Sequence, residues 1–226
     1  QRCPVGINTG DLVRKLRARN AHHTGTANWL AEHFAGALAG TRLTLRAANG
    51  VRQLLGAPLL SKTSSALRRL SGKRLPEWTA AMPQAVQALR ISAPKDDQRP
   101  RVVYLAACVS RAMGPAFGDR EQLPLLDKTR ALLEKGGFQV VFPDDLDNLC
   151  CGQPFASKGY AEQADNKRQE LLNALLKASR GGLDPIYCDT SPCTLRLLQD
   201  GLDPRLKLHD PVKFIREQLL ERLTFT

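Results

Sequence analysis

The sequence predicts an α/β protein in two parts, residues 1–99 and residues 100–226. Apolar residues in the first part recur at helical spacing, without the alternation typical of strands. In the second part, short runs rich in β-branched residues alternate with helix-length segments, and pairs of glycines end two of the helices. This alternation predicts a small parallel sheet between two layers of helices, which is a three-layer unit.

The first part is expected to be all-helical up to residue 55. Asp11 is suited to cap the first helix. Apolar residues at helical spacing predict three helices, over residues 11–19, 29–38 and 41–55. Residues 60–97 contain three prolines together with several serines and glycines. We therefore expect a long irregular connector there, with one short helix near residues 82–89.

The second part is expected to begin with a strand and to alternate regularly. The β-rich runs predict strands over residues 101–107, 138–142 and 185–188. Helices are expected over residues 121–135, 159–180 and 192–198, with a last one opened by Asp210 and Pro211. Parallel strands need such crossover helices, so this order supports the parallel sheet.

Composition narrows the class of protein. Six cysteines in 226 residues are too few for a disulfide scaffold and favour metal or redox chemistry. The sequence contains no run of 18 apolar residues, so it predicts no transmembrane helix, and no signal peptide is visible. The chain begins at Gln1 rather than Met, so we expect it to be a portion of a longer protein. A cytoplasmic location is expected, with possible contact on the inner membrane face.

The net positive charge of the chain comes entirely from the first part. Residues 1–99 hold 16 Lys and Arg against 5 Asp and Glu, whereas residues 100–226 hold 17 of each kind. This excess of +11 suits an acidic partner domain, an anionic membrane surface or a solvated face. Aromatic residues make up only 5% of the chain and do not interleave with the basic ones. Nucleic-acid binding is therefore not expected.

Five cysteines are expected to converge at one edge of the sheet. They are Cys108, Cys150, Cys151, Cys188 and Cys193. Between successive cysteines lie 41, 0, 36 and four residues. Each follows or ends a predicted strand, and sites in parallel sheets gather beyond the carboxyl ends of strands.

Thiolates are soft ligands that suit iron–sulfur clusters or zinc. Gly152 would allow the tight backbone that two adjacent sulfurs need. Cys188, the last residue of a buried strand, is equally readable as a small apolar residue. A disulfide between Cys150 and Cys151 would be strained, so it ranks low. Arg111 and Lys158 are candidates to offset the charge of thiolates.

Three motifs carry a resemblance to the cysteine-rich CCG domain. They are Cys108-Val-Ser-Arg, then Leu149-Cys-Cys-Gly-Gln-Pro-Phe-Ala-Ser-Lys-Gly, then Asp189-Thr-Ser-Pro-Cys-Thr-Leu. This domain occurs in heterodisulfide reductases, in the iron–sulfur subunits of glycolate oxidases and in lactate-utilisation proteins. Residues 100–226 look most similar to the C-terminal portion of FAD-linked D-lactate dehydrogenases that carry their own iron–sulfur modules.

The N-terminal stretch Arg2-Cys3-Pro4-Val5-Gly6 resembles the tail of a bacterial ferredoxin motif, in which the last cysteine precedes proline. The resemblance makes Cys3 a cluster ligand whose partners lie outside this chain. The helices that follow resemble the helical extension of such ferredoxin modules.

The sequence departs from the family in two respects. The family usually has two CCG repeats, and one is present here. Thr190 and Ser191 stand where the usual Cys-x-x-Cys ending would supply a second cysteine. Either a second repeat supplies further ligands, or this half holds no cluster.

The resemblance implies the iron–sulfur electron-transfer portion of an FAD-dependent D-lactate or 2-hydroxy acid dehydrogenase. Its 4Fe-4S cluster would use the cysteines above, with Cys188 the least expected ligand. FAD would lie in a flavoprotein domain or subunit outside this chain, and electrons would pass to a quinone or cytochrome. The alternatives are a zinc-binding or metal-free docking module and, third, a thiol–disulfide role.

Overall fold

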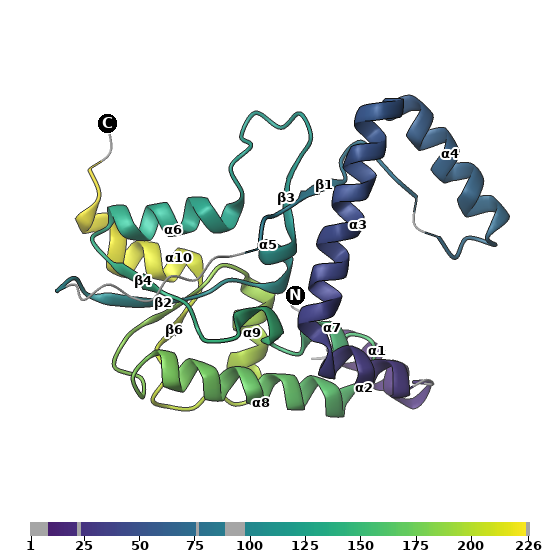
Figure 1. Ribbon diagram of the computed structural model, residues 1–226. Coiled ribbons are helices and arrows are strands. Elements are labelled where there is room, and N and C mark those ends of the chain that lie inside the picture. Colours follow the sequence, from purple (N-terminus) through teal and green to yellow (C-terminus); the bar gives the residue numbers. More distant parts are fainter. Residues whose placement is uncertain (1–8, 22–23, 76, 89–97, 225–226) are drawn as a thin grey trace.

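The computed structural model describes residues 9–21, 24–75, 77–88 and 98–224. Figure 1 shows an α/β unit on one side and, beside it, a long helix that leads to a projecting helical arm. The prediction for Cys3 falls outside the described residues.

A parallel sheet with strand order β4-β2-β5-β6 forms the centre of the α/β unit. Its strands are β2 (Arg101–Leu105), β4 (Gln139–Val141), β5 (Ile186–Cys188) and β6 (Leu208–His209). Val103 pairs with Val141 on one side and with Ile186 on the other. Strand β2 is therefore central, which explains why its run of Val, Val and Tyr is fully buried.

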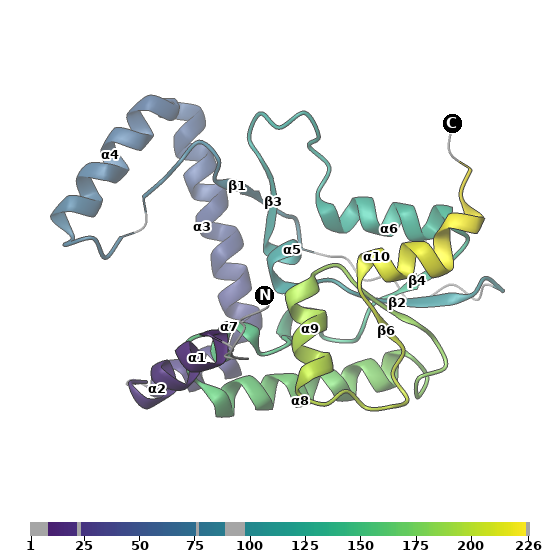
Figure 2. The same cartoon turned by 180° about the vertical axis from the view of Figure 1, so that it is seen from behind.

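Helices cover both faces of this sheet. In Figures 1 and 2, α6 and α10 lie on one face, and α8 and α9 lie on the other. Their bounds are α6 (Leu125–Lys135), α8 (Ala161–Ala178), α9 (Ser191–Gln199) and α10 (Pro211–Phe214). The α/β class, the parallel sheet and the helical extension are thus confirmed.

The core is built from the apolar faces that the helical spacing predicted. Leu133 of α6 and Leu171 and Leu175 of α8 are essentially inaccessible to solvent. Tyr187 meets Tyr104 and Phe214 edge to face, with ring centroids 5.7 and 5.4 Å apart. Full burial of each such side chain contributes about 1.5–3 kcal/mol, so this packing holds the strand ends in place.

The described residues of the N-terminal part are mainly helical up to residue 55, which confirms the helical extension. The helix expected over residues 29–38 is broken at His33, and its second half belongs to the following helix. The helices of this part are α1 (Thr9–Arg19), α2 (Thr24–Glu32), α3 (Phe34–Leu55) and α4 (Ala57–Leu70). The last of these corrects the predicted irregular connector. Pro58 lies in the first turn of α4, where proline is compatible with a helix.

The short helix expected near residues 82–89 is also wrong. Residues Pro83–Ala85 form strand β1, which pairs antiparallel with β3 (Met113–Ala116). Pro83 is the first residue of this strand, a position where its missing N–H costs little. The pairing depends on a partner about 30 residues away, which local patterns do not reveal.

Short elements connect the larger ones. They are α5 (Cys108–Ala112), η1 (Leu146–Asn148), α7 (Gln153–Ala156), a π-helical turn η2 (Ile215–Leu219) and η3 (Leu220–Arg222). Within the described ranges, no helix combines the length and the apolar character needed to cross a bilayer.

Helix α1 lies against Gly159, the last residue of the segment 149–159 that carries Cys150 and Cys151. We call this segment the cysteine loop. Gly159 has a φ of +93°, and a Cβ there would lie 2.5 Å from the backbone nitrogen of Ala18. Arg17 also donates from Nη1 to the Ser157 carbonyl at 2.6 Å. We expect Gly159→Ala to displace α1, since a helix backbone has no room to yield.

Hydrogen exchange should then show faster exchange across residues 9–19, while protection of α8 persists because α1 buries no residue. Gly118→Ala is the control, because its φ is +90° but its Cβ would meet open space. Equal exchange of α1 in both variants would contradict this contact.

Candidate functional site

The strand ends bring five cysteines to one edge of the sheet. Cys108 begins α5 after β2, and Cys188 ends β5. Cys150 and Cys151 follow β4, and Cys193 lies in the first turn of α9. Strand β2 lies between β4 and β5, so the order of the strands along the chain switches from one side of β2 to the other. Ligand sites of open α/β sheets lie at such switch points.

The five sulfurs form one continuous line of contacts. The Sγ atoms of Cys151 and Cys193 are 3.1 Å apart. The Cys150 thiol also interacts with those of Cys108 and Cys151, and the Cys193 thiol with that of Cys188. We call this line, Cys108–Cys150–Cys151–Cys193–Cys188, the sulfur cluster. All five are free thiols; Cys108 is partly exposed and the other four are buried.

Cys188 fits both interpretations that its sequence position allowed. It is fully buried in the main core, as a small apolar residue would be. Its thiol also interacts with Cys193 and lies 3.6 Å from the Thr190 carbonyl oxygen. The structure therefore places Cys188 at the inner end of the sulfur cluster.

Neighbouring thiols shift one another's acidity. Hydrogen bonds from Cys150 and then Cys193 lower the pKa of Cys151, because a thiolate is a better acceptor than a thiol. A hydrogen bond with Cys150 likewise lowers the pKa of Cys108 to about 7, helped by the charge of Arg111. The donating thiols of Cys150 and Cys193 have raised pKa values for the same reason. A hydrogen bond from Cys193 lowers the pKa of Cys188 as well, so thiolates, the metal-binding form, are favoured at Cys108, Cys151 and Cys188.

Arg111 is the buried positive charge beside this cluster. Its side chain is only 2% exposed, and Nη2 donates to the Leu149 carbonyl at 2.6 Å. Nη1 donates to the Leu146 carbonyl. The guanidinium therefore holds the backbone that leads into Cys150, and burial lowers its own pKa. Lys158, the other residue singled out in the sequence, is exposed.

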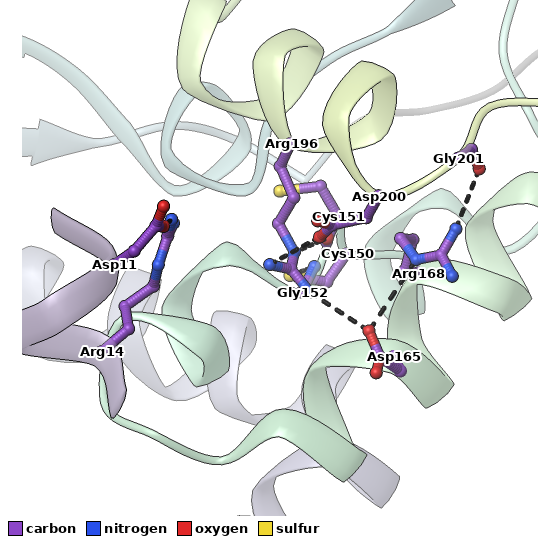
Figure 3. Close-up of polar contacts among 10 residues, drawn as sticks. All are labelled: Asp11, Arg14, Cys150, Cys151, Gly152, Asp165, Arg168, Arg196, Asp200 and Gly201. Atoms are coloured by element: carbon purple, nitrogen blue, oxygen red, sulfur yellow. Dashed lines mark hydrogen bonds and ion pairs between the residues drawn. The ribbon is translucent and has the colours of Figure 1, made fainter. Parts of the chain in front are cut away.

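Arg196 is a second arginine at the cluster, and the sequence patterns above did not single it out. Figure 3 shows it between Cys151 and Asp165, and its Nε donates to the Cys151 carbonyl at 3.1 Å. Ion pairs with Asp165 and Asp200, at 3.3 and 2.8 Å, fix its orientation. Its position three residues after Cys193 on one helix was the available signal, because such residues share a helix face.

Backbone geometry also fixes the cysteine loop. Gly152 adopts a left-handed conformation with φ of +81°, and a Cβ there would lie 2.2 Å from the Ala164 carbonyl oxygen. Asp189 accepts hydrogen bonds from the Ala107 N–H and the Tyr104 hydroxyl, both at 2.9 Å. The carboxylate therefore ties the end of β2 to the end of β5 next to Cys188.

Across the described part of the chain, no three His, Cys, Asp or Glu side chains surround a position for a single metal ion. The sulfurs touch one another in a line, so a bound metal centre would have to separate them. A surface hollow of about 450 Å³ adjoins the first turn of α9, which carries Cys193. Its lining includes Arg14, Pro192 and Arg196 but none of the five cysteines, so the hollow adjoins the cluster without reaching a sulfur.

Comparison with family models, curated proteins and solved structures produced no match for this chain. The resemblance to the CCG domain therefore stays a prediction carried by the three motifs. The chemistry of the site has to be argued from the sulfur cluster and the two arginines beside it.

Proposed function

We propose that this chain is the iron–sulfur electron-transfer portion of an FAD-dependent dehydrogenase acting on D-lactate or a related 2-hydroxy acid. Electrons from the flavin would pass through this portion to a quinone or cytochrome. One observation supports the proposal most directly: five thiols from three strand ends meet at the switch point of a parallel sheet. The substrate class is what the resemblance of the three sequence motifs to the CCG domain implies.

The residues of the cluster suit an iron–sulfur group chemically. Cys108, Cys150, Cys151 and Cys193 would hold it, with Cys188 as a fifth sulfur. Thiolates are the common protein ligands of such clusters, and burial together with nearby positive charge tunes their reduction potential. Arg111 and Arg196 supply that charge, and Arg111 is almost fully buried. When bound, the group would supply one-electron transfer.

The protein's own contribution would be to bind, shield and orient. Tyr104 and Asp189 hold two strand ends at a fixed separation. Phe34 of α3 packs on Phe155 of α7, with ring centroids 6.2 Å apart, so the helical extension covers the cysteine loop. The same contact would help to keep water from the cluster.

One distance favours a second candidate, a thiol–disulfide role for Cys151 and Cys193. Their sulfurs are 3.1 Å apart, which is longer than a disulfide bond but within reach of one after a small movement. Forming that bond would release two electrons and two protons to an external oxidant. A zinc-binding or metal-free docking module is the remaining alternative. Elemental analysis and thiol titration separate the three.

Anaerobic reconstitution with iron and sulfide tests the proposal. We expect the purified chain to take up both elements, to gain visible charge-transfer absorption and to give an EPR signal in one redox state. Cys150→Ser and Cys151→Ser should each remove most of the bound iron, because a hydroxyl is a poor ligand for such clusters.

Cys3→Ser is the matched control. Cys3 is expected to serve a cluster whose other ligands lie outside this chain, so iron bound by the sulfur cluster should not change. A colourless protein whose thiols all titrate would contradict the proposal. One zinc per chain without iron would favour the docking module instead.

A further inference from the structure

Helix α4 carries its leucines on the outside. Leu59, Leu67 and Leu70 are 48%, 55% and 85% exposed, and the helix buries no residue. These positions follow one another at i, i+8 and i+11, so they share one face of the helix. Leu54, five residues before Leu59 at the end of α3, is 86% exposed as well. We call these four leucines the leucine ridge.

The opposite face of α4 is polar, although it is the face that meets the rest of the protein. Ser64 accepts a hydrogen bond from the Trp78 backbone N–H at 3.2 Å. Ser65 donates to Glu77 at 2.5 Å, and Arg68 donates to the Leu75 carbonyl at 3.0 Å. A surface helix normally packs its leucines against the protein core, whereas α4 presents them to solvent. Contiguous exposed leucines of this kind mark an interaction surface.

The charge around the ridge is mainly positive, with Glu77 as the acidic residue that contacts α4 through Ser65. Residues 34–75 contain eight Lys and Arg and no Asp or Glu. Some of these are engaged within the protein: Arg42 pairs with Asp147, and Arg52 lies 3.5 Å from the centroid of the Phe117 ring. Lys62 and Arg69 of α4 are exposed, as are Lys73 and Arg74 just beyond its end. This excess of positive charge favours an anionic occupant.

A second copy of the chain does not match this preference. Two such arms packed on each other would oppose like charges with no acidic residue within residues 34–75 to pair them. An amphipathic helix with leucines on one face and lysine or arginine beside them is the form that binds a membrane interface.

We propose that α4 and the end of α3 lie flat on an anionic lipid membrane. The leucine ridge would enter the boundary between headgroups and acyl chains, while Lys62, Arg69, Lys73 and Arg74 would contact lipid phosphates.

The shape of the molecule allows this orientation. Figures 1 and 2 show α4 at the outer end of α3, projecting beyond the α/β unit. The other end of α3 is anchored by buried Phe34 and Leu38 beside the cysteine loop. Membrane contact at α4 would thus leave the hollow beside α9 open to a protein partner. The proposal does not depend on the iron–sulfur proposal, because the ridge contains no cluster residue.

Co-sedimentation of the full chain with vesicles tests this surface. We expect binding to vesicles that mix phosphatidylglycerol with phosphatidylcholine, and weak binding to phosphatidylcholine alone. Added salt should weaken the binding, because it screens surface charge. Lys62→Gln with Arg69→Gln should weaken it about tenfold or more, as two cations near an anionic surface are lost.

The triple variant Leu59→Ser, Leu67→Ser and Leu70→Ser should abolish sedimentation. It should still fold, since none of the three side chains is buried. A triple variant of exposed apolar residues on the α/β unit, Leu183→Ser, Leu198→Ser and Val212→Ser, is the control and should bind like the parent chain.

Three outcomes would overturn the proposal. One is the absence of binding to anionic vesicles. Another is binding that the α4 triple variant and its control retain equally. The third is a dimer in solution that the α4 substitutions dissociate, because the ridge would then belong to a second copy.

Discussion

Gly152→Ala is expected to destabilise the α/β unit by about 3 kcal/mol or more, the upper range for single substitutions. Gly152 has a φ of +81°, and a left-handed backbone costs other residues about 1–2 kcal/mol. The new Cβ would also lie 2.2 Å from the Ala164 carbonyl oxygen, so α8 or the cysteine loop must move. Denaturant unfolding followed by circular dichroism measures the loss.

Gly137→Ala separates the steric effect from backbone strain. Gly137 has a nearly identical φ of +79°, but its Cβ would meet nothing within 4 Å. Only the conformational cost of about 1–2 kcal/mol should therefore appear. Equal losses in the two variants would show that close packing against Ala164 does not determine the stability of the loop.

The same substitution should also affect metal uptake. Cys150 and Cys151 directly precede Gly152, and Cys151 contacts Cys193 across the site. Movement of the loop would turn Cys150 and Cys151 away from the other cysteines that would share a cluster, so we expect Gly152→Ala to take up little iron and sulfide. Gly137→Ala should take up as much as the parent chain. Normal uptake by Gly152→Ala would mean that the loop tolerates the change.

Arg42→Ala is expected to release the helical extension from the cysteine loop. Arg42 is a buried residue of α3 whose two terminal nitrogens each donate to Asp147 at 2.8 Å. Its Nε donates to the Arg111 carbonyl at 3.0 Å, so one side chain joins α3 to η1 and α5. We expect a loss of about 1–3 kcal/mol, below the value for a fully buried pair because Asp147 is 35% exposed.

Arg46→Ala is the matched control, because Arg46 is exposed on the same helix and α3 should tolerate alanine there. Hydrogen exchange should show weaker protection of η1 and α5 in Arg42→Ala only. Unchanged protection in that variant would show that the apolar contacts of Phe34 and Leu38 suffice to hold α3.

The Arg42–Asp147 pair also gives the stability a pH dependence. Hydrogen bonds from Arg42 lower the pKa of Asp147 below its ordinary value of 3.8. Burial of the carboxylate opposes this shift, and the positive charge of Arg42 adds to it. A lowered folded-state pKa stabilises the fold above the unfolded-state value, and this contribution disappears as pH falls through the folded-state value. Asp147→Asn should therefore be less stable at pH 7 and less sensitive to pH below about 4. A parallel decline of both proteins with acid would contradict this assignment.

Local sequence patterns were enough to predict the α/β class and the parallel sheet, because hydrophobic spacing and glycine pairs are local signals. They were also enough to show that the five cysteines follow strand ends, which places them at one edge of any parallel sheet. The position of Arg111 three residues after Cys108 was enough to predict that its charge lies near the cysteines.

Features that depend on partners far along the chain came only from the folded molecule. The pairing of β1 with β3 and the burial of Arg42 against Asp147 join segments 30 to 105 residues apart. Arg196 faces the cluster only because α9 packs beside α7. Most of helix α4 was expected to belong to a connector because residues 60–97 contain three prolines with several serines and glycines. In the structure α4 ends at Leu70, before the first of those prolines, and no sequence pattern states which surroundings a helix will have. These four features share one cause. The spacing of residues in the sequence shows which side chains lie on the same face of a helix or strand, but only folding decides what that face contacts.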